Sequence, residues 1–320
     1  MSQKHLVYVD GQEGTTGLRI HEMLAARSDI EVLKIEAEKR KNVAERARLI
    51  NASDVTFLCL PDAASREAAS LVTNPKTCLI DASTAFRTDP NWVFGLPELA
   101  PGQRDAIRAS RRIANPGCHA TAFILLVRPL VDAGLISPDA LLSATSITGY
   151  SGGGKSMIEA YEAGGNPDLM APRPYGLGLA HKHLPEMKAH GRLLNAPIFM
   201  PIVGPFLKGL TVSILLPVSM LKTGPVSGAA EAVQDCLANR YQGEAFVQVM
   251  PLRDPETLAG GFFNSQRCNE TNRAELFIFG NDEQVLLMAC IDNLGKGASG
   301  AAVQNMNLVL GCEEGAGLVN

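Results

Sequence analysis

The sequence predicts an α/β protein made of a Rossmann-type, doubly wound parallel sheet and a second, α+β domain with a larger sheet. Strand-like and helix-like runs alternate through the first ~90 residues, whereas most later runs resemble strands. A glycine-rich turn follows the first strand-like run, as in nucleotide-binding sheets. A chain of 320 residues is long enough for two domains, each with its own core.

Short, β-branched runs mark the strands of the first domain. We expect strands at Leu6–Val9, Ile30–Ile35, Val55–Leu60 and Cys78–Ile80, and helices at Thr16–Ala26, Asn42–Ile50 and Ala63–Val72. Residues 81–117 contain four prolines. We therefore expect loops there, around one polar helix at Gln103–Ser110. Loops that follow parallel strands are where sites form.

The second domain begins with a strongly apolar helix at Ala120–Ala133, which we expect Pro129 to kink. Strand-like runs follow at Leu141–Thr148, Leu210–Pro217, Ala245–Val249, Leu276–Phe279 and Val285–Asp292. The closing run Gly297–Leu310 predicts a helix.

Composition excludes several classes of protein. Lys and Arg total 29 against 33 Asp and Glu, so the net charge of -4 leaves no basic excess for nucleic acid. No apolar run reaches the ~20 residues of a membrane span, and we expect a cytoplasmic protein without membrane contacts. Seven cysteines without a C-x-x-C pair favour reduced thiols, one of them reactive, over disulfides or a zinc site.

The turn after the first strand has the pattern G-x-x-G-x-x-G and opens a helix. Its candidate cofactor residues are Gly11, Gly14, Thr15, Thr16 and Gly17. Glycines let the backbone approach a pyrophosphate, and the helix N-terminus supplies unpaired amides and partial positive charge. The alternative is a plain glycine turn.

Three cations follow the second strand, where a nucleotide ribose binds in such folds. Lys39, Arg40 and Lys41 favour the 2′-phosphate of NADP(H), although a solvated helix start explains them almost as well.

The turn Asn115-Pro116-Gly117 places Cys118 at the mouth of the apolar helix. The helix dipole and unpaired amides there stabilise a thiolate and lower its pKa, so Cys118 is a candidate nucleophile. The alternative is a buried structural cysteine. His181 and His183 precede a Pro-Glu helix start, and one of them is a candidate acid/base. We expect no bound metal, because this pair lacks further ligands nearby.

A rival motif spans residues 149–156, which match the phosphate loop G-x-x-x-x-G-K-S and follow a strand. Gly164, Gly165 and Pro167 interrupt the helix that should follow, and a second nucleotide site would lie far from the first glycine turn. An NTPase is therefore the weaker interpretation.

Seven motifs together resemble the shorter N-acetyl-gamma-glutamyl-phosphate reductases of arginine biosynthesis. They cover nearly the whole chain: Asp10-Gly11 with 14–17, 81–87, 95–98, 115–118, 151–155, 181–186 and 292–300. The resemblance implies an NADP-binding domain at 1–117, completed by 297–320, and a catalytic domain at 118–296 with oligomer contacts, hence a dimer or tetramer. One departure is His119, where the family usually has tyrosine; we treat it only as a perturber of the thiol.

The implied reaction is the NADPH-dependent reduction of N-acetyl-γ-glutamyl phosphate to the γ-semialdehyde, with release of inorganic phosphate. Cys118 forms a thioester, and His183 is preferred over His181 for the proton. Ser83 and Arg87 hold the phosphate, unless Ser83 contacts the cofactor instead.

The remaining expected contacts are assigned to two groups. Asn293 and Gly295 lie at the nicotinamide end, and Asn115, Gly152 and Lys155 contact the substrate. The alternatives are aspartate-semialdehyde dehydrogenase and, from other classes, the NTPase or a thiol hydrolase that never uses hydride.

Overall fold

A computed structural model describes residues 4–222 and 228–320. The chain divides into two compact units, which are described separately. Unit 1 comprises Met1–Gly117 with Ala298–Val319, and unit 2 comprises Cys118–Gly297 with Asn320.

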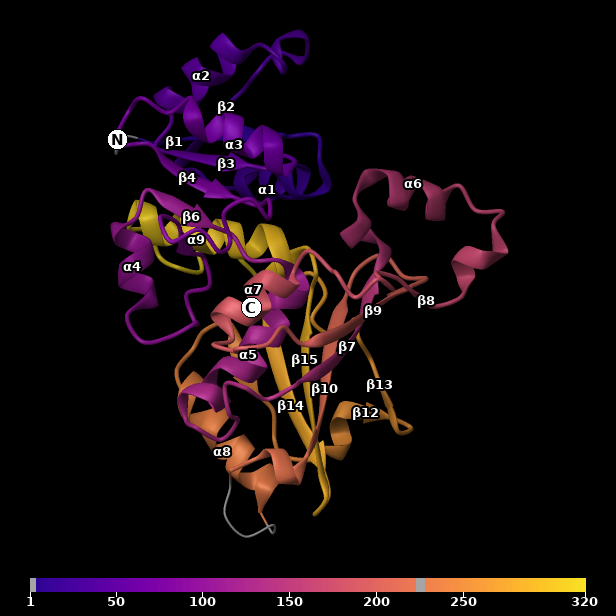
Figure 1. Cartoon of the computed structure of the whole chain (residues 1–320). Coiled ribbons are helices and arrows are strands. Elements are labelled where there is room, and N and C mark those ends of the chain that lie inside the picture. Colours follow the sequence, from indigo (N-terminus) through magenta and orange to yellow (C-terminus); the bar gives the residue numbers. More distant parts are fainter. Residues whose placement is uncertain (1–3, 223–227) are drawn as a thin grey trace. The chain divides into compact units, whose positions relative to one another are not determined.

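The described part of unit 1 forms a six-stranded sheet in the order β2-β1-β3-β4-β6-β5 (Figure 1). All its strand pairs are parallel. β2 lies on one side of β1, and β3 lies on the other side. The topological switch point of this doubly wound sheet is therefore between β1 and β3. The strands are β1 (His5–Asp10), β2 (Ile30–Leu33), β3 (Val55–Leu58), β4 (Cys78–Asp81), β5 (Val93–Phe94) and β6 (Arg112–Ala114).

Helices cover both faces of this sheet, because β1 alternates its side chains. Val7 and Val9 share one core cluster with residues of α1, α4 and α9, whereas Tyr8 points to a second cluster with α2 and α3. The C-terminal helix therefore packs within unit 1. These helices are α1 (Thr15–Ala25), α2 (Val43–Ala52), α3 (Asp62–Ser70), α4 (Gln103–Ala109) and α9 (Gly300–Leu310).

One expectation for unit 1 is wrong. The segment expected to be loops around one helix also contains β5 and β6, which have only two and three residues and lie among prolines. The closing helix is confirmed: 297–310 is helical throughout, and its first residues belong to a π-helical turn, Gly295–Ser299, that runs into α9.

Unit 2 contains a mixed sheet, of seven strands in its described residues, in the order β11-β14-β15-β10-β7-β9-β8. β7 and β9 are parallel, as are β11 and β14, and the other pairs are antiparallel. The strands are β7 (Ser143–Gly149), β8 (Arg173–Pro174), β9 (Ile198–Gly204), β10 (Leu210–Pro217), β11 (Val247–Val249), β14 (Ala274–Gly280) and β15 (Gln284–Ile291), with a separate hairpin of β12 (Leu258–Ala259) and β13 (Phe262–Phe263).

The helices of unit 2 are α5 (Cys118–Asp132), α6 (Lys155–Glu162), α7 (Leu184–His190) and α8 (Ala229–Tyr241). α5 and α8 pack on one face of the sheet, and α7 packs on α5. On the other face, side chains of three neighbouring strands are exposed: Ile147, Ile198, Met200 and Leu215. α5 continues through Pro129 to Asp132. The sequence did not predict four further elements of this unit, namely β8, β9, α6 and α8.

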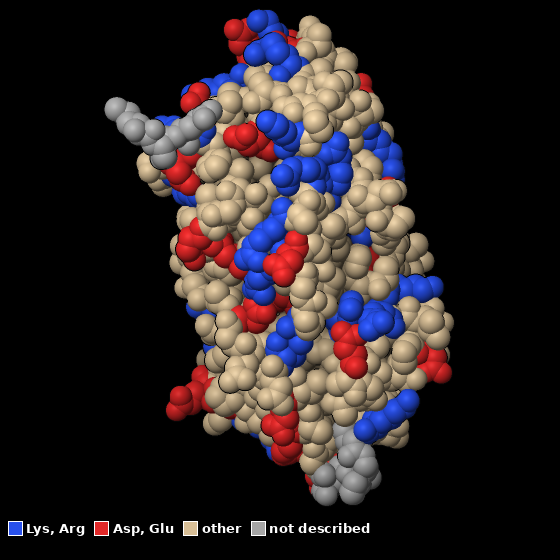
Figure 2. Space-filling model, turned by 90° about the vertical axis from the view of Figure 1, so that its left-hand side faces the viewer, with Lys and Arg blue, Asp and Glu red and all other residues tan. Residues whose placement is uncertain are grey.

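The surface carries both signs of charge. On the face that Figure 2 shows, Lys and Arg side chains are interspersed with Asp and Glu. Among the residues that the structure describes, no helix is long and apolar enough to cross a membrane.

Candidate functional site

A cavity of about 700 Å³ lies at the switch point of the unit 1 sheet. Three loops line it, each at the carboxyl end of a strand: 11–14 after β1, 35–41 after β2 and 59–61 after β3. Ligands of open parallel sheets bind in this crevice, so the cavity is where a dinucleotide would fit.

The glycine turn lies at the edge of this cavity, and α1 begins directly after it at Thr15. Gly11 adopts a φ of +90°, and a Cβ there would lie only 2.2 Å from the carbonyl oxygen of Cys59. Only glycine fits both the conformation and the space. Thr15, Thr16 and Gly17 form the first turn of α1, where backbone amides lack helical partners and favour an anion.

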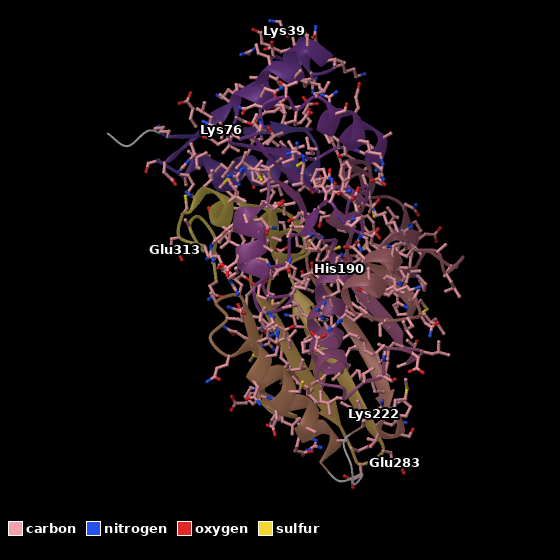
Figure 3. The ribbon with its side chains drawn as sticks, turned by 60° about the vertical axis from the view of Figure 1, so that its left-hand side comes forward. Lys39, Lys76, His190, Lys222, Glu283 and Glu313 are labelled. Atoms are coloured by element: carbon pink, nitrogen blue, oxygen red, sulfur yellow. The ribbon has the colours of Figure 1, made fainter. Side chains whose placement is uncertain are left out.

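The three cations after β2 have different positions. Arg40 and Lys41 line the cavity, and Arg40 forms an ion pair with Glu13 of the glycine turn. Lys39 lies outside the lining set, and its Nζ is 2.7 Å from Glu36 Oε2. Figure 3 shows Lys39 at the outer edge of its unit.

A buried ion pair lines part of the cavity. Arg46 of α2 donates through Nε and Nη2 to Asp10 Oδ2, at 3.0 and 2.9 Å, and through Nη1 to Glu67 at 3.2 Å. Burial raises the pKa of Asp10, and Arg46 opposes that rise. The pair fixes the end of β1, from which the glycine turn starts.

Ser83, Arg87 and Asn115 make hydrogen bonds within unit 1. Ser83 Oγ donates to Asp81 at 2.6 Å, and Arg87 donates to the carbonyl oxygens of Asn115 and Ala82. Asn115 Nδ2 donates to Ala298 O at 3.0 Å. These bonds hold the turn that precedes Cys118.

Cys118 is the first residue of α5, a helix of 15 residues, and it is partly exposed. The N-terminus of a helix carries partial positive charge, which is favourable for a nucleophilic sulfur at this position. Gly297 packs directly against it, since a Cβ on Gly297 would lie 2.7 Å from Cys118 Cβ. By contrast, burial raises the pKa of Cys59 and Cys78 to about 12, which keeps those thiols protonated.

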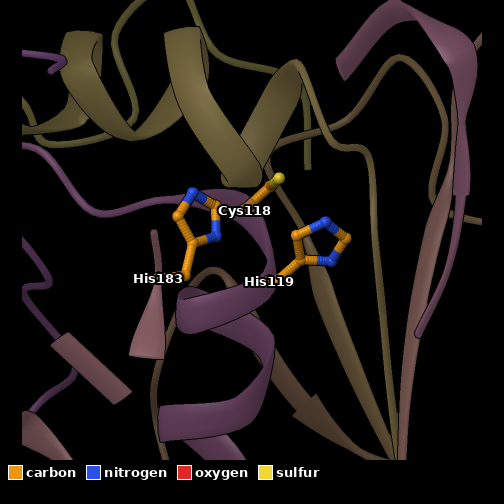
Figure 4. A group of neighbouring side chains, drawn as sticks. All are labelled: Cys118, His119 and His183. Atoms are coloured by element: carbon orange, nitrogen blue, oxygen red, sulfur yellow. The ribbon is translucent and has the colours of Figure 1, made fainter. Parts of the chain in front are cut away.

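Two imidazoles of unit 2, His119 and His183, lie beside Cys118, and a third, His181, lies beside both of them. The His119 ring lies 5.4 Å from both the His181 and the His183 rings, and those two rings are 4.8 Å apart. The Cys118 sulfur and ring nitrogens of His119 and His183 all lie within 4.8 Å of one another (Figure 4). The structure therefore places both predicted histidines near the predicted nucleophile, with His183 in the closer set.

Hydrogen bonds give each imidazole a different setting. His183 Nε2 lies 4.0 Å from the buried carboxylate of Glu186, and His181 Nδ1 accepts from the backbone N–H of His183 at 3.2 Å. His119 lies between Ser146 Oγ, 2.9 Å from Nδ1, and the Tyr175 hydroxyl, 3.0 Å from Nε2.

Burial keeps two of these rings neutral. It lowers the pKa of His119 to about 3 and that of His181 to about 4, and the nearby charge of Lys182 lowers both further. His181 also contributes to the low pKa of His119. At neutral pH these two rings are hydrogen-bonding groups without charge.

The glycine-rich loop of the rival phosphate motif is tied to Asn293. Asn293 Nδ2 donates to Ser151 Oγ at 2.8 Å, and its Oδ1 accepts from Gly209 N at 2.8 Å. Lys155 begins α6 with its side chain exposed, 3.8 Å from Glu159. Its partner is therefore a carboxylate one turn further along α6, whereas a phosphate-loop lysine contacts the bound phosphates.

Tyr175, Ser146 and Glu186 lie beside the cluster of Cys118, His119, His181 and His183, and sequence reasoning assigned none of them to it. Tyr175 follows a two-residue strand inside a loop region, which gives no pattern. Ser146 did carry a signal, because strand alternation places it on the same buried face as Ala144. A polar residue on such a face needs a partner, which here is His119.

Family models match both units. Residues 7–108 match the NAD binding domain of semialdehyde dehydrogenases, and residues 118–293 match the semialdehyde dehydrogenase dimerisation domain. Among solved structures, aspartate semialdehyde dehydrogenase II of Vibrio cholerae, complexed with ASA, aligns with a TM-score of 0.72 at 16% identity, over 97% of this chain and 99% of that one. That of Francisella tularensis gives 0.71 at 14%, over 96% and 100%. These likenesses confirm the fold class.

Sequence relatives are much closer. N-acetyl-gamma-glutamyl-phosphate reductase 2 of Nostoc sp. is 46% identical over 98% of this chain and 99% of its own length. The Pseudomonas putida protein of that name is 45% identical over 98% and 99%, and the Burkholderia ambifaria reductase is 45% identical over 96% of each chain. The resemblance drawn from the sequence motifs is confirmed: the chain belongs to the N-acetyl-gamma-glutamyl-phosphate reductases, within the semialdehyde dehydrogenase family.

Proposed function

We propose that the protein reduces N-acetyl-γ-glutamyl phosphate to N-acetylglutamate γ-semialdehyde with NADPH, releasing inorganic phosphate. The observation that carries this proposal is the position of Cys118 at the N-terminus of α5, beside His183. An acyl phosphate is an activated carbonyl compound, and a thiolate beside an imidazole is the nucleophile suited to it.

In the first step the Cys118 sulfur attacks the acyl carbon. The S–C bond forms, the bond from carbon to the phosphate oxygen breaks, and phosphate leaves with both electrons of that bond. The product is a thioester on Cys118, which divides one difficult reduction into two easier steps.

In the second step the thioester is reduced to a thiohemiacetal, which releases the aldehyde as the C–S bond breaks. His183 takes the Cys118 proton before the thiolate attacks and returns a proton when the sulfur leaves. Glu186, 4.0 Å from His183 Nε2, orients the ring and stabilises its protonated form.

Bound NADPH supplies the hydride that reduces the thioester. The cavity of unit 1 suits this cofactor by size and lining, since the amides of α1 face a pyrophosphate and the two cations Arg40 and Lys41 suit a 2′-phosphate. Lys39 is a weaker candidate for the phosphate, because Glu36 already pairs with it.

The remaining contacts extend the same proposal. Arg87 and Ser83 bind the departing phosphate. Alternatively, Ser83 contacts the cofactor. Asn115 orients the substrate. In unit 2, Gly152 and Lys155 belong to a loop that contacts the substrate. The hydrogen bond from Asn293 to Ser151 holds this loop in place. The backbone at Asn293 and Gly295 lies against the nicotinamide ring of the bound cofactor.

A homodimer completes the proposal. Ile198, Met200 and Leu215 form an exposed apolar face on the sheet of unit 2, the unit that matches a dimerisation domain. Met200→Glu would then yield monomers by light scattering after size exclusion. Leu141→Glu, at a more exposed apolar residue outside the strands, would leave the dimer intact.

The reaction is tested in reverse, with NADP⁺, phosphate and the semialdehyde, and forward with a substrate panel. N-acetyl-γ-glutamyl phosphate should be preferred over β-aspartyl phosphate, and one NADPH should be consumed per phosphate released. Preference for the aspartyl substrate would instead indicate an aspartate-semialdehyde dehydrogenase. Phosphate release without NADPH oxidation would indicate a hydrolase, and ATP hydrolysis with Mg²⁺ an NTPase.

A further inference from the structure

We propose that Cys118, His119 and His183 form a three-ligand site for Zn²⁺, through which the metal reversibly blocks the nucleophile. A thiolate and two imidazoles are the donors that zinc prefers, and three protein ligands leave the fourth position of the tetrahedron open to water. The three donor atoms lie within 4.8 Å of one another, and both imidazoles are buried. In Figure 4 the two rings flank the Cys118 side chain.

The distances require only a small adjustment. Zinc sets its sulfur and nitrogen ligands roughly 3.5 Å apart, given Zn–S of about 2.3 Å and Zn–N of about 2.0 Å. Side-chain rotations at Cys118 and His183 close the difference. The backbone of both residues lies at helix starts, Cys118 in α5 and His183 before α7, and stays in place.

Groups behind the ligands already resemble the second shell of a zinc site. A metal-bound histidine usually donates its other ring N–H to a carboxylate, carbonyl or hydroxyl. His119 already has this contact, with Ser146 Oγ 2.9 Å from Nδ1. For His183 the available carboxylate is Glu186, 4.0 Å from Nε2 and so beyond hydrogen-bond distance until the ring rotates. His119 Nε2 then binds the metal in exchange for its hydrogen bond to Tyr175, whose hydroxyl turns to solvent.

His119 supplies the third ligand of this site. A tyrosine in its place would not do so, because a neutral phenol is a poor zinc ligand. Binding replaces the Cys118 thiol proton by the metal, so one proton is released and the sulfur electron pair is no longer available for attack on the substrate. Zinc should therefore compete with acyl phosphate.

The test uses the whole protein without substrate or cofactor, so that its result does not depend on the proposed reaction. Co²⁺ replaces Zn²⁺ as a spectroscopic probe, and a thiolate-to-cobalt charge-transfer band reports coordination by Cys118. Zn²⁺ affinity is measured by competition with a chromophoric chelator. Cys118→Ala should abolish the band.

His119→Tyr is the decisive variant. We expect Zn²⁺ binding to weaken by more than about 100-fold, and Ser146→Ala to weaken it by about 10-fold through loss of the outer hydrogen bond. His181→Asn, at an equally close ring outside the ligand set, should change it less than about 3-fold. Retained far-ultraviolet circular dichroism identifies folded variants, and His119→Gln replaces His119→Tyr if the latter does not fold.

Two results would overturn the proposal. One is a wild type without a thiolate-to-cobalt band; the other is an affinity for Zn²⁺ that His119→Tyr and His119→Gln leave unchanged, which would show that Cys118 and His183 bind the metal without His119.

Discussion

The cavity of unit 1 is formed mainly by backbone, whereas the cluster of Cys118, His119, His181 and His183 in unit 2 is formed by side chains. The cavity is formed by backbone at strand ends, with solvated charges such as Arg40 and Glu13 around it. The cluster consists of side chains that are largely removed from water, with His119 hydrogen-bonded at both ring nitrogens. Substitutions should therefore have graded effects at the cavity and severe effects at the cluster, because buried polar groups depend on every partner.

The largest effect is expected at Cys118. Cys118→Ala removes the atom that forms the thioester, so turnover should fall by at least about 10⁴-fold while NADPH binding, measured by fluorescence, stays unchanged. Cys118→Ser should keep only a trace of activity. Iodoacetamide should modify Cys118 ahead of Cys59 and Cys78, whose thiols stay protonated, and acyl phosphate should protect it. Reductase activity in Cys118→Ala would contradict the thioester mechanism.

The next effect separates the two histidines of the cluster. His183→Asn should lower kcat by about 10²–10⁴-fold, because the proton carrier near Cys118 is lost. His181→Asn should lower it far less, since burial keeps the pKa of His181 at about 4, too low for a proton carrier at neutral pH. The pH profile of kcat/KM distinguishes proton transfer from a structural defect, as only His183→Asn should remove one limb. The opposite ranking would assign the proton to His181.

The cavity also contains one buried element, and it should behave like the cluster. Arg46→Ala leaves the Asp10 carboxylate buried without its main partner, which should cost about 3–5 kcal/mol in the free energy of unfolding. Arg48→Ala, on the same helix but in an exposed pair with Glu45, should cost far less, because water screens that pair. Equal costs, measured by urea unfolding, would mean that burial of the Asp10 pair does not matter.

The same contrast explains what the sequence could predict. Cys118 and the glycine turn were predictable because a local pattern defines each: a Pro-Gly turn before a helix, and glycines between a strand and a helix. α8 was missed although Ala229, Val233, Leu237 and Tyr241 recur every four residues on its buried face. β9 was missed because Pro201 interrupts its pattern.

The partners of His119 could not be predicted. Ser146 and Tyr175 come from elements 27 and 56 residues away, and only the folded chain brings their hydroxyls to one imidazole. The departure from tyrosine at position 119 was visible in the sequence, but its consequence depends on these contacts.

A smaller effect is expected at the cations of the cavity. Arg40→Ala should raise the KM for NADPH by about 10-fold, the equivalent of one charge-assisted hydrogen bond weakened by solvent, and Lys41→Ala should act in the same direction. The KM for NADH should stay nearly constant, because NADH lacks the 2′-phosphate. Equal changes for both cofactors would contradict a 2′-phosphate site at these residues.

The smallest effects should come from the carboxylates that pair with these cations. Glu13 shares Arg40 with any bound phosphate, so Glu13→Gln should lower the KM for NADPH by about 2–3-fold and leave that for NADH unchanged. Lys39→Ala should change either KM less than about 2-fold, because Lys39 is exposed and paired with Glu36 outside the cavity. Raising the salt concentration should erase the Glu13 effect, since it acts between solvated charges. If Lys39→Ala instead raises the KM for NADPH as much as Arg40→Ala does, the 2′-phosphate lies at the outer edge of the loop. Glu13→Gln should then change the KM of neither cofactor.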